Sequence, residues 1–225
     1  MRMLTLAIFA LAVLVFAPGN TPPGESGEII DLFNGENLDG WSHVLVDDAV
    51  AREDVWSVKD GVLICTGTPM GYLHTDASYQ DFRLTLDWRW APGQEPGNSG
   101  VLLRINGEAV SFLPQCVEAQ LRHGSAGDIW AFYGAAVTGD EARSTAVVGH
   151  DPLGDFKGVR KTEDAENAPG EWNHYEIVVR GPSMELSVNG KRVNEAQGLD
   201  VRSGPIGLQS EGGEIHFRNI RLEKL

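Results

Sequence analysis

Residues 81–90 read DFRLTLDWRW, and this segment decides the fold class. Every second residue from Phe82 to Trp90 is large and apolar, while the residues between them are polar or charged. Successive side chains of a β-strand point to opposite faces of a sheet, so one face of this segment is apolar and the other polar. The pattern predicts a strand with one face in a hydrophobic core.

The same alternation recurs along most of the chain, with turn residues about every eight to twelve positions. Further strands are expected at residues 99–105, 116–122, 172–180, 184–188, 205–209 and 214–222. Helical periodicity is almost absent beyond the N-terminal apolar run, which favours an all-β sandwich or barrel.

Two turn sequences, Lys59-Asp60-Gly61 and Asn189-Gly190, predict β-hairpins. The alternation changes phase within the last strand, which predicts a bulge near residues 218–219. Residues 138–169 contain few apolar side chains. They are expected to form a long excursion from the sandwich, either mobile or functional.

Residues 1–19 have the features of a secretory signal peptide. Arg2 provides a positive start, and residues 4–17 are apolar apart from Thr5. This run is shorter than the roughly 20 residues that span a membrane. The protein is therefore expected to be exported to the periplasm or the extracellular space, with no membrane insertion after removal of the signal.

Residues 20–27, with the sequence NTPPGESG, are expected to be a disordered leader. Residues 28–225 are expected to form a single β-sandwich domain, because no linker-like stretch or internal repeat divides them. The chain has 18 Lys and Arg against 32 Asp and Glu, a formal net charge of −14. This balance disfavours nucleic acid and anionic membranes as partners, and it is compatible with a neutral ligand or simply with solubility.

The two cysteines, Cys65 and Cys116, both fall in expected strands. In an oxidising compartment they could form one disulfide, provided that their Cα atoms come within about 7 Å. The sequence leaves this pairing open. It also leaves a metal requirement open, because the histidines are scattered and no defined calcium loop is present.

Five segments between residues 32 and 222 form a series of motifs: LFNGENLDGW at 32–41, WSVKDGVL at 56–63, NSGV at 98–101, EAQ at 118–120 and GPIGLQ at 204–209. Their order and spacing are more specific than any one motif. Together they resemble a family of 3-keto-disaccharide hydrolases or 3-keto-glucoside lyases. The resemblance implies a concanavalin A-like jelly-roll sandwich of two antiparallel sheets, acting on a small carbohydrate without a cofactor. Residues 120–171 depart from many members of the family, which leaves the substrate preference open.

Glu118 and Gln120 are two positions apart on one expected strand, so they share a face of the sheet. On pattern alone, a half-buried strand that simply alternates is the favoured explanation of these two residues. With the resemblance, they become a candidate site for cleaving or hydrating 3-keto-glucosides, in which Glu118 removes the C2 proton of the sugar. Arg104 or Gln120 would stabilise the enolate, and Arg104 near Glu118 would keep the carboxylate ionised.

His123 follows this strand and is the candidate acid, although a lone histidine beside a strand end more often has a structural role. Asp128, Trp130 and Tyr133 are candidates for substrate binding, the two aromatic residues by stacking on a pyranose ring. Asp87 is included because it could face the same polar sheet surface; the alternative is a solvated strand residue.

Two other functions remain open from the sequence. A non-catalytic carbohydrate-binding module would use the same concave face. A conventional glycoside hydrolase would need a second carboxylate from elsewhere, because Gln120 can neither attack nor protonate a sugar.

Overall fold

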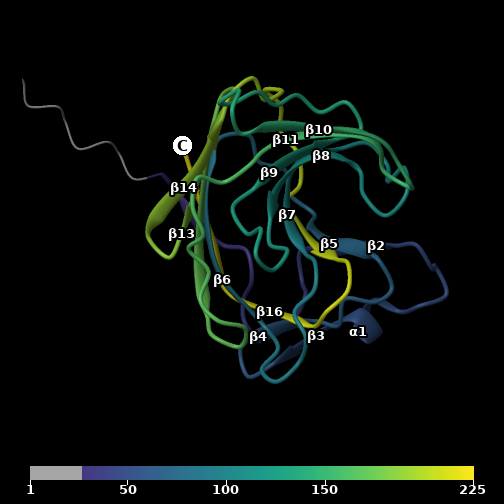
Figure 1. Cartoon of the computed structure of the whole chain (residues 1–225). Helices are drawn as coiled ribbons and strands as arrows, with labels where there is room; N and C mark the ends of the chain where they lie inside the picture. The colour runs from purple at the N-terminus through teal and green to yellow at the C-terminus, as the bar shows by residue number, and fades with distance from the viewer. Residues whose placement is uncertain (1–26) are drawn as a thin grey trace, which may run out of the picture.

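The computed structural model describes residues 27–225 and contains two antiparallel β-sheets packed face to face (Figure 1). The predicted signal peptide and nearly all of the predicted leader lie outside these residues. Within residues 27–225 no helix has the length and apolar character needed to cross a membrane. Helix α1 (Arg52–Val55) is a single turn.

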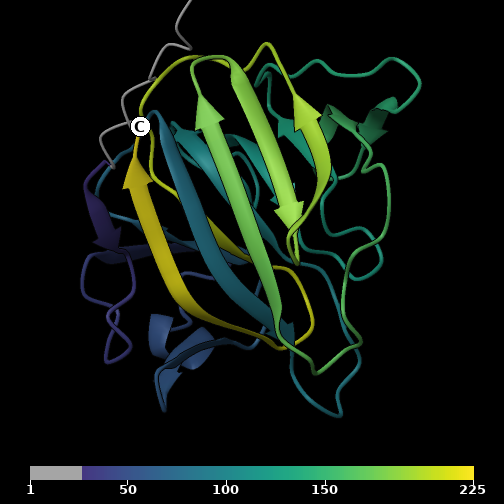
Figure 2. The same cartoon turned by 90° about the vertical axis from the view of Figure 1, so that its left-hand side faces the viewer.

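Sheet A contains the strand that the opening pattern predicts, β6 (Phe82–Trp90). Its other strands are β14 (Lys191–Ala196), β13 (Ser183–Val188), β12 (Asn173–Arg180), β16 (Ile215–Lys224), β4 (Val62–Cys65), β3 (Trp56–Lys59) and β1 (Ile29–Asp31). The spatial order is β14-β13-β12-β6-β16-β4-β3, and β1 pairs with β16. Figure 2 looks onto this sheet, where β6 lies between β16 in yellow and the green strand β12.

Sheet B carries the pocket described below. Its strands are β10 (Ser144–His150), β11 (Gly154–Val159), β9 (Ile129–Phe132), β8 (Gln115–Gln120), β7 (Gly100–Asn106), β15 (Gly207–Ser210), β5 (Gly71–Thr75) and β2 (Trp41–Leu45), given in spatial order. The late strand β15 lies between β7 and β5, so it brings residues near 210 beside residues near 100. This crossover between distant parts of the chain positions the pocket.

The hydrophobic core lies between the two sheets. Every second residue of β6 from Phe82 to Trp90 is at most 2% exposed, as the alternation predicts. In sheet B, Val117 and Ala119 point into the same core, so Glu118 and Gln120 point to the outer face of the sheet. The predicted all-β sandwich of two antiparallel sheets is confirmed.

The predicted turns and the predicted bulge are also present. Asn189 and Gly190 both have positive φ angles, 51° and 77°, as a type I′ hairpin requires. The register between β16 and β6 shifts between Arg218 and Arg221, next to the predicted position.

Residues 138–169 differ from the expectation of a long excursion, because they include the β10–β11 hairpin at the edge of sheet B. The sequence did not predict this hairpin because most of its residues are exposed, and apolar and polar side chains do not alternate regularly along it.

A second apolar cluster covers part of the outer face of sheet B. We call it the outer cluster. Its buried members are Tyr72, Leu102, Ile105, Phe112, Leu113, Cys116, Trp130, Phe132 and Leu153. Because this cluster covers the outer face of β7, that strand is buried on both sides and shows no polar face.

The two cysteines are free. Cys65 lies in the core between the sheets, whereas Cys116 lies in the outer cluster on the far side of sheet B. A sheet therefore separates the two thiols, and the possible disulfide is absent. Burial raises the pKa of the Cys65 thiol to about 11, and burial raises that of Cys116 well above its ordinary value.

We expect both thiols of the folded protein to resist alkylation at pH 8, because each is buried and protonated. Iodoacetamide labelling followed by mass spectrometry should give unlabelled native protein and two modified cysteines after denaturation in urea. The midpoint of thermal unfolding should be unchanged by a reducing agent. A lower midpoint under reducing conditions would reveal a disulfide.

Candidate functional site

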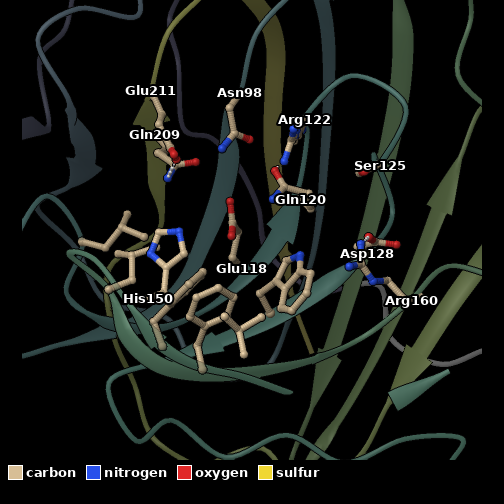
Figure 3. Close-up of a pocket in the computed structure, with 16 residues that line it drawn as sticks. Asn98, Glu118, Gln120, Arg122, Ser125, Asp128, His150, Arg160, Gln209 and Glu211 are labelled. Carbon is tan, nitrogen blue, oxygen red and sulfur yellow. Dashed lines mark hydrogen bonds and ion pairs between the residues drawn. The ribbon is translucent and has the colours of Figure 1, made fainter. Parts of the chain in front are cut away.

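A pocket of about 280 Å³ opens on the outer face of sheet B over strand β8 (Figure 3). The strands β8, β9, β10, β11 and β15, together with residues of the adjoining loops, supply its lining. Four of the predicted site residues line this pocket: Glu118, Gln120, Asp128 and Trp130. Figure 3 shows the carboxyl group of Glu118 in the middle of the pocket and directed toward Asn98.

Glu118 is buried without a compensating partner. Its side chain is 1% exposed, and Oε1 has no hydrogen-bond partner among residues 27–225. Gly100 on the neighbouring strand makes room for it, because a Cβ atom at position 100 would collide with the carboxyl group. Strand pairing sets this contact, since Leu102 and Gly100 lie opposite Glu118 and Gln120.

The environment of Glu118 favours its protonated form. Burial raises the pKa of this carboxyl group well above its ordinary value, and the negative charges of Glu211 and Asp128 raise it further. No ion pair joins Arg104 to Glu118, so the expectation that arginine keeps Glu118 ionised is wrong. A protonated carboxyl group can donate a hydrogen bond or a proton to a ligand.

Glu211 is a further carboxyl group of the pocket, beside Glu118 and Asp128. It follows β15, and its backbone pairs with that of Asn98. Burial raises the pKa of Glu211 above its ordinary value, although hydrogen bonds with Asn98 and Gln209 and the nearby side chains of Arg122 and His150 lower it in part. Glu118 has none of these stabilising partners. Glu211 is therefore the more readily ionised of the two.

Two amide side chains beside these carboxyl groups also lack partners for their oxygen atoms. Asn98 Oδ1 and Gln209 Oε1 are buried and accept no hydrogen bond from the described part of the chain. Together with Glu118 Oε1, they give the pocket three unpaired polar atoms. Buried polar groups are normally paired, so these atoms indicate a site that is completed by a ligand or by water.

Gln120 presents its amide nitrogen rather than its oxygen as the free group. Its Oε1 accepts hydrogen bonds from the backbone N–H groups of Leu121 and Arg122, at 2.9 and 2.8 Å. The amide NH₂ is left as a donor at the pocket wall. This arrangement suits a ligand oxygen.

Asp128 and Trp130 line the pocket but are engaged with other side chains. Asp128 accepts hydrogen bonds from Arg160 Nη1 and from the backbone N–H of Lys161, both at 2.8 Å. The guanidinium group of Arg160 lies 4.7 Å from the ring centroid of Trp130, and Phe156 packs edge-on against the same ring. Trp130 is therefore part of a packed wall, and Phe156, which is half-buried, is the more accessible aromatic group.

Arg104 does not line the pocket. The register between β7 and β8 shifts after Leu103, and Arg104 has a positive φ angle of 50°. Its guanidinium group donates hydrogen bonds to the carbonyl oxygens of Gln80 and Asp200 and pairs with Asp81. The expected convergence of Arg104 with Glu118 is thus corrected, because the bulge turns this side chain elsewhere.

Three further candidates also lie outside the pocket. His123 lines a neighbouring depression, with its Nδ1 atom 3.6 Å from Glu166. Tyr133 packs against the outer cluster.

Asp87 belongs to β6, so it faces outward from sheet A, where it pairs with His174 and Arg218. Two sheets therefore separate Asp87 from the pocket. The prediction failed because the alternation of β6 fixes the face on which Asp87 lies but not which sheet carries it.

Four residues of the pocket were not predicted from the sequence: Asn98, His150, Gln209 and Glu211. The alternation of β15 places Leu208 in the core and Gln209 outside, a signal that was present in the sequence. The missing information was that β15 lies in the same sheet as β8, with only β7 between them. For His150, on the edge hairpin, the sequence carried no usable signal.

No set of three or more His, Cys, Asp or Glu side chains within residues 27–225 is arranged to hold a metal ion. A comparison of the sequence with curated proteins gives no match. The model of one family, described as a 3-keto-alpha-glucoside-1,2-lyase-like domain, matches residues 28–223.

Solved structures similar to this chain are carbohydrate-related β-sandwiches. A putative glycosyl hydrolase from Parabacteroides distasonis has 21% identity and a TM-score of 0.63, covering 88% of this chain and 94% of that one. A carbohydrate-binding module from Bacillus subtilis has 14% identity and a TM-score of 0.59, covering 81% and 94%. A β-glucanase from Bacillus licheniformis has 12% identity and a TM-score of 0.57, covering 90% and 100%. These likenesses confirm the concanavalin A-like jelly-roll fold.

We expect the variant Glu118→Gln to be more stable than the original protein, by a margin that grows with pH. The folded-state pKa of Glu118 is raised, so above about pH 5 the unfolded chain releases this proton while the folded protein retains it. Stability is then lost as pH rises, by up to about 1.4 kcal/mol per pH unit. Urea unfolding of both proteins at several pH values measures the difference. Parallel pH profiles would contradict the raised pKa.

Gly100→Ala should destabilise the protein by about 1–3 kcal/mol through overpacking against Glu118. The same change in a Glu118→Ala background should cost much less, because the colliding carboxyl group is gone. A double-mutant cycle on the free energy of unfolding measures this coupling. Equal costs in the two backgrounds would show that Gly100 does not make room for Glu118.

Proposed function

Because this chain belongs to the family of 3-keto-alpha-glucoside-1,2-lyase-like domains, we propose that it cleaves the glycosidic bond of a 3-keto-glucoside by elimination. The observation that carries the proposal is the pair of carboxyl groups in one pocket, Glu118 and Glu211: burial raises the pKa of both, but only Glu211 has partners that oppose this rise. Such a pair supplies both an acid and a base at the same pH.

A ketone at C3 makes the hydrogen on C2 acidic, because the resulting carbanion is an enolate. In the proposed step a base takes the C2 proton, and the C2–H electron pair forms the C1–C2 double bond. The C1–O bond breaks, its electron pair stays on the glycosidic oxygen, and that oxygen receives a proton. The step is redox-neutral and releases the aglycone as an alcohol. Addition of water to the double bond is the corresponding hydration.

We assign the base to Glu211, whose pKa is raised less because its partners oppose the effect of burial, and the acid to Glu118, whose pKa burial raises well above its ordinary value. This reverses the role that the sequence suggested for Glu118. The free amide NH₂ of Gln120 is the donor for the developing enolate oxygen. The unpaired oxygens of Asn98 and Gln209 accept hydrogen bonds from sugar hydroxyl groups.

A conventional glycoside hydrolase is the second candidate, because Glu211 provides the second carboxyl group that such an enzyme requires. The two mechanisms differ in the substrate. Elimination needs the C3 ketone, whereas direct hydrolysis acts on the unoxidised glycoside.

The reaction is proposed to take place outside the cytoplasm. This part rests on residues 1–17, whose charge and apolar run have the pattern of a secretory signal.

Glu211→Gln should lower kcat on methyl 3-keto-glucoside by about 10²–10⁴, the usual effect of removing a general base. Glu118→Gln should lower kcat on the same substrate to a similar extent. On 4-nitrophenyl 3-keto-glucoside, Glu118→Gln should be far less harmful, because nitrophenolate leaves without a proton. Steady-state kinetics with both substrates separate the acid from the base.

Asp87→Asn is the matched control, since this carboxylate lies on the outer face of sheet A. Its kinetics should equal those of the original protein. Turnover of the unoxidised glycosides would favour the conventional hydrolase. Saturable sugar binding with no turnover of either substrate, unaffected by the glutamate variants, would instead identify a carbohydrate-binding module.

A further inference from the structure

The pocket has two unlike walls, and the strand order of sheet B sets them apart. Glu118 on β8 lies between them. On the side of β7 and β15, the lining residues are Asn98, Gln209 and Glu211. On the side of β9, β11 and β10, most of the lining is apolar. In Figure 3 the labelled polar groups Asn98, Gln120, Gln209 and Glu211 lie on one side of the pocket, and unlabelled carbon-rich side chains lie on the other.

The polar wall matches a sugar. Two of its oxygen atoms, on Asn98 and Gln209, and one on the adjacent Glu118 lack a donor among residues 27–225. The hydroxyl groups of a pyranose ring are donors that would satisfy them.

The apolar wall is the edge of the outer cluster that faces the pocket. Val147 and Phe156 are partly buried and pack against this cluster. Trp130, Phe132 and Leu153 lie behind them and also line the pocket. Phe156 contacts the rings of Trp130 and Phe132, with centroids 5.3 and 5.0 Å apart, so the wall is a connected aromatic surface.

A second sugar unit would be poorly placed against this wall. Its hydroxyl groups would lose water there, and the five apolar side chains offer a single hydrogen-bond donor in return, the indole N–H of Trp130. A flat apolar group would instead gain from the burial of its surface and from aromatic contact with Phe156.

We propose that the apolar wall is the aglycone subsite, and that it selects glycosides of aromatic alcohols over oligosaccharides. The inference rests on the proposed function to the extent that the sugar occupies the polar wall. It adds the class of leaving group, a phenol or a related aryl alcohol. The His150 ring, 5.5 Å from that of Phe156, closes the subsite at the end of the hairpin.

The test measures binding of unoxidised glucosides, which keeps it separate from the elimination chemistry. The probes are the methyl and phenyl glucosides in both anomeric forms, and the disaccharides maltose and cellobiose. Calorimetry on the full protein should show that one phenyl anomer binds roughly tenfold more tightly than its methyl counterpart, from burial of the phenyl ring. The disaccharides should bind no more tightly than the methyl glucosides.

Two variants locate the effect. Phe156→Ser and Val147→Ser should remove most of the phenyl advantage while leaving the affinity for methyl glucoside unchanged. The matched control is Val148→Ser, because the neighbouring Val148 is 80% exposed and does not line the pocket. It should bind all probes as the original protein does. Val147→Ser keeps the test valid if Phe156→Ser fails to fold, because Val147 lies on the edge strand and is only half-buried.

Tighter binding of a disaccharide than of phenyl glucoside would overturn the inference. So would an equal loss of affinity for methyl and phenyl glucosides in the Val147 and Phe156 variants, which would mean that the wall stacks on the sugar itself. A phenyl advantage in a protein without lyase activity would leave the subsite standing and reject the proposed function. Lyase activity with a disaccharide preference would do the reverse.

Discussion

The packing of both sheets against one apolar core is the constraint on which the pocket depends. Once Val117 and Ala119 are committed to that core, the intervening Glu118 must point to the other face of sheet B. A carboxyl group on a buried central strand has little access to water, and strand pairing gives it Gly100 and Leu102 as neighbours instead of a cation. Its unusual protonation follows from the backbone arrangement rather than from any dedicated partner.

Much of the scaffold could be predicted because its signals are local. The alternation of β6 and the paired positive φ angles at Asn189 and Gly190 depend on a few consecutive residues. The placement of Arg104 could not be predicted, because a bulge after Leu103 interrupts the alternation of inward and outward side chains along the strand. A strand pattern gives faces correctly only while the register holds.

The site was recovered in part for a related reason. Glu118 and Gln120 share a strand, so their common face is a local property. Glu211 reaches the pocket because β15 inserts between β7 and β5, and no short-range pattern specifies which strands are neighbours. Asp87 shows the same limit, since its outward orientation was clear but the sheet to which it belongs was not. Residues of one functional face are thus predictable strand by strand, whereas their assembly is a property of the topology.

The place of the β10–β11 hairpin in the sheet has a consequence for how the protein can diversify. Glu118 occupies a central strand, where almost any change disturbs the core. Val147 and Phe156 lie on β10 and β11, the two adjacent strands at one edge of sheet B. Edge segments have few neighbours, so they tolerate substitution, lengthening and shortening better than central ones. Evolution can therefore change which ligands enter the pocket while Glu118 stays the same. Relatives with this scaffold should differ most in the β10–β11 hairpin.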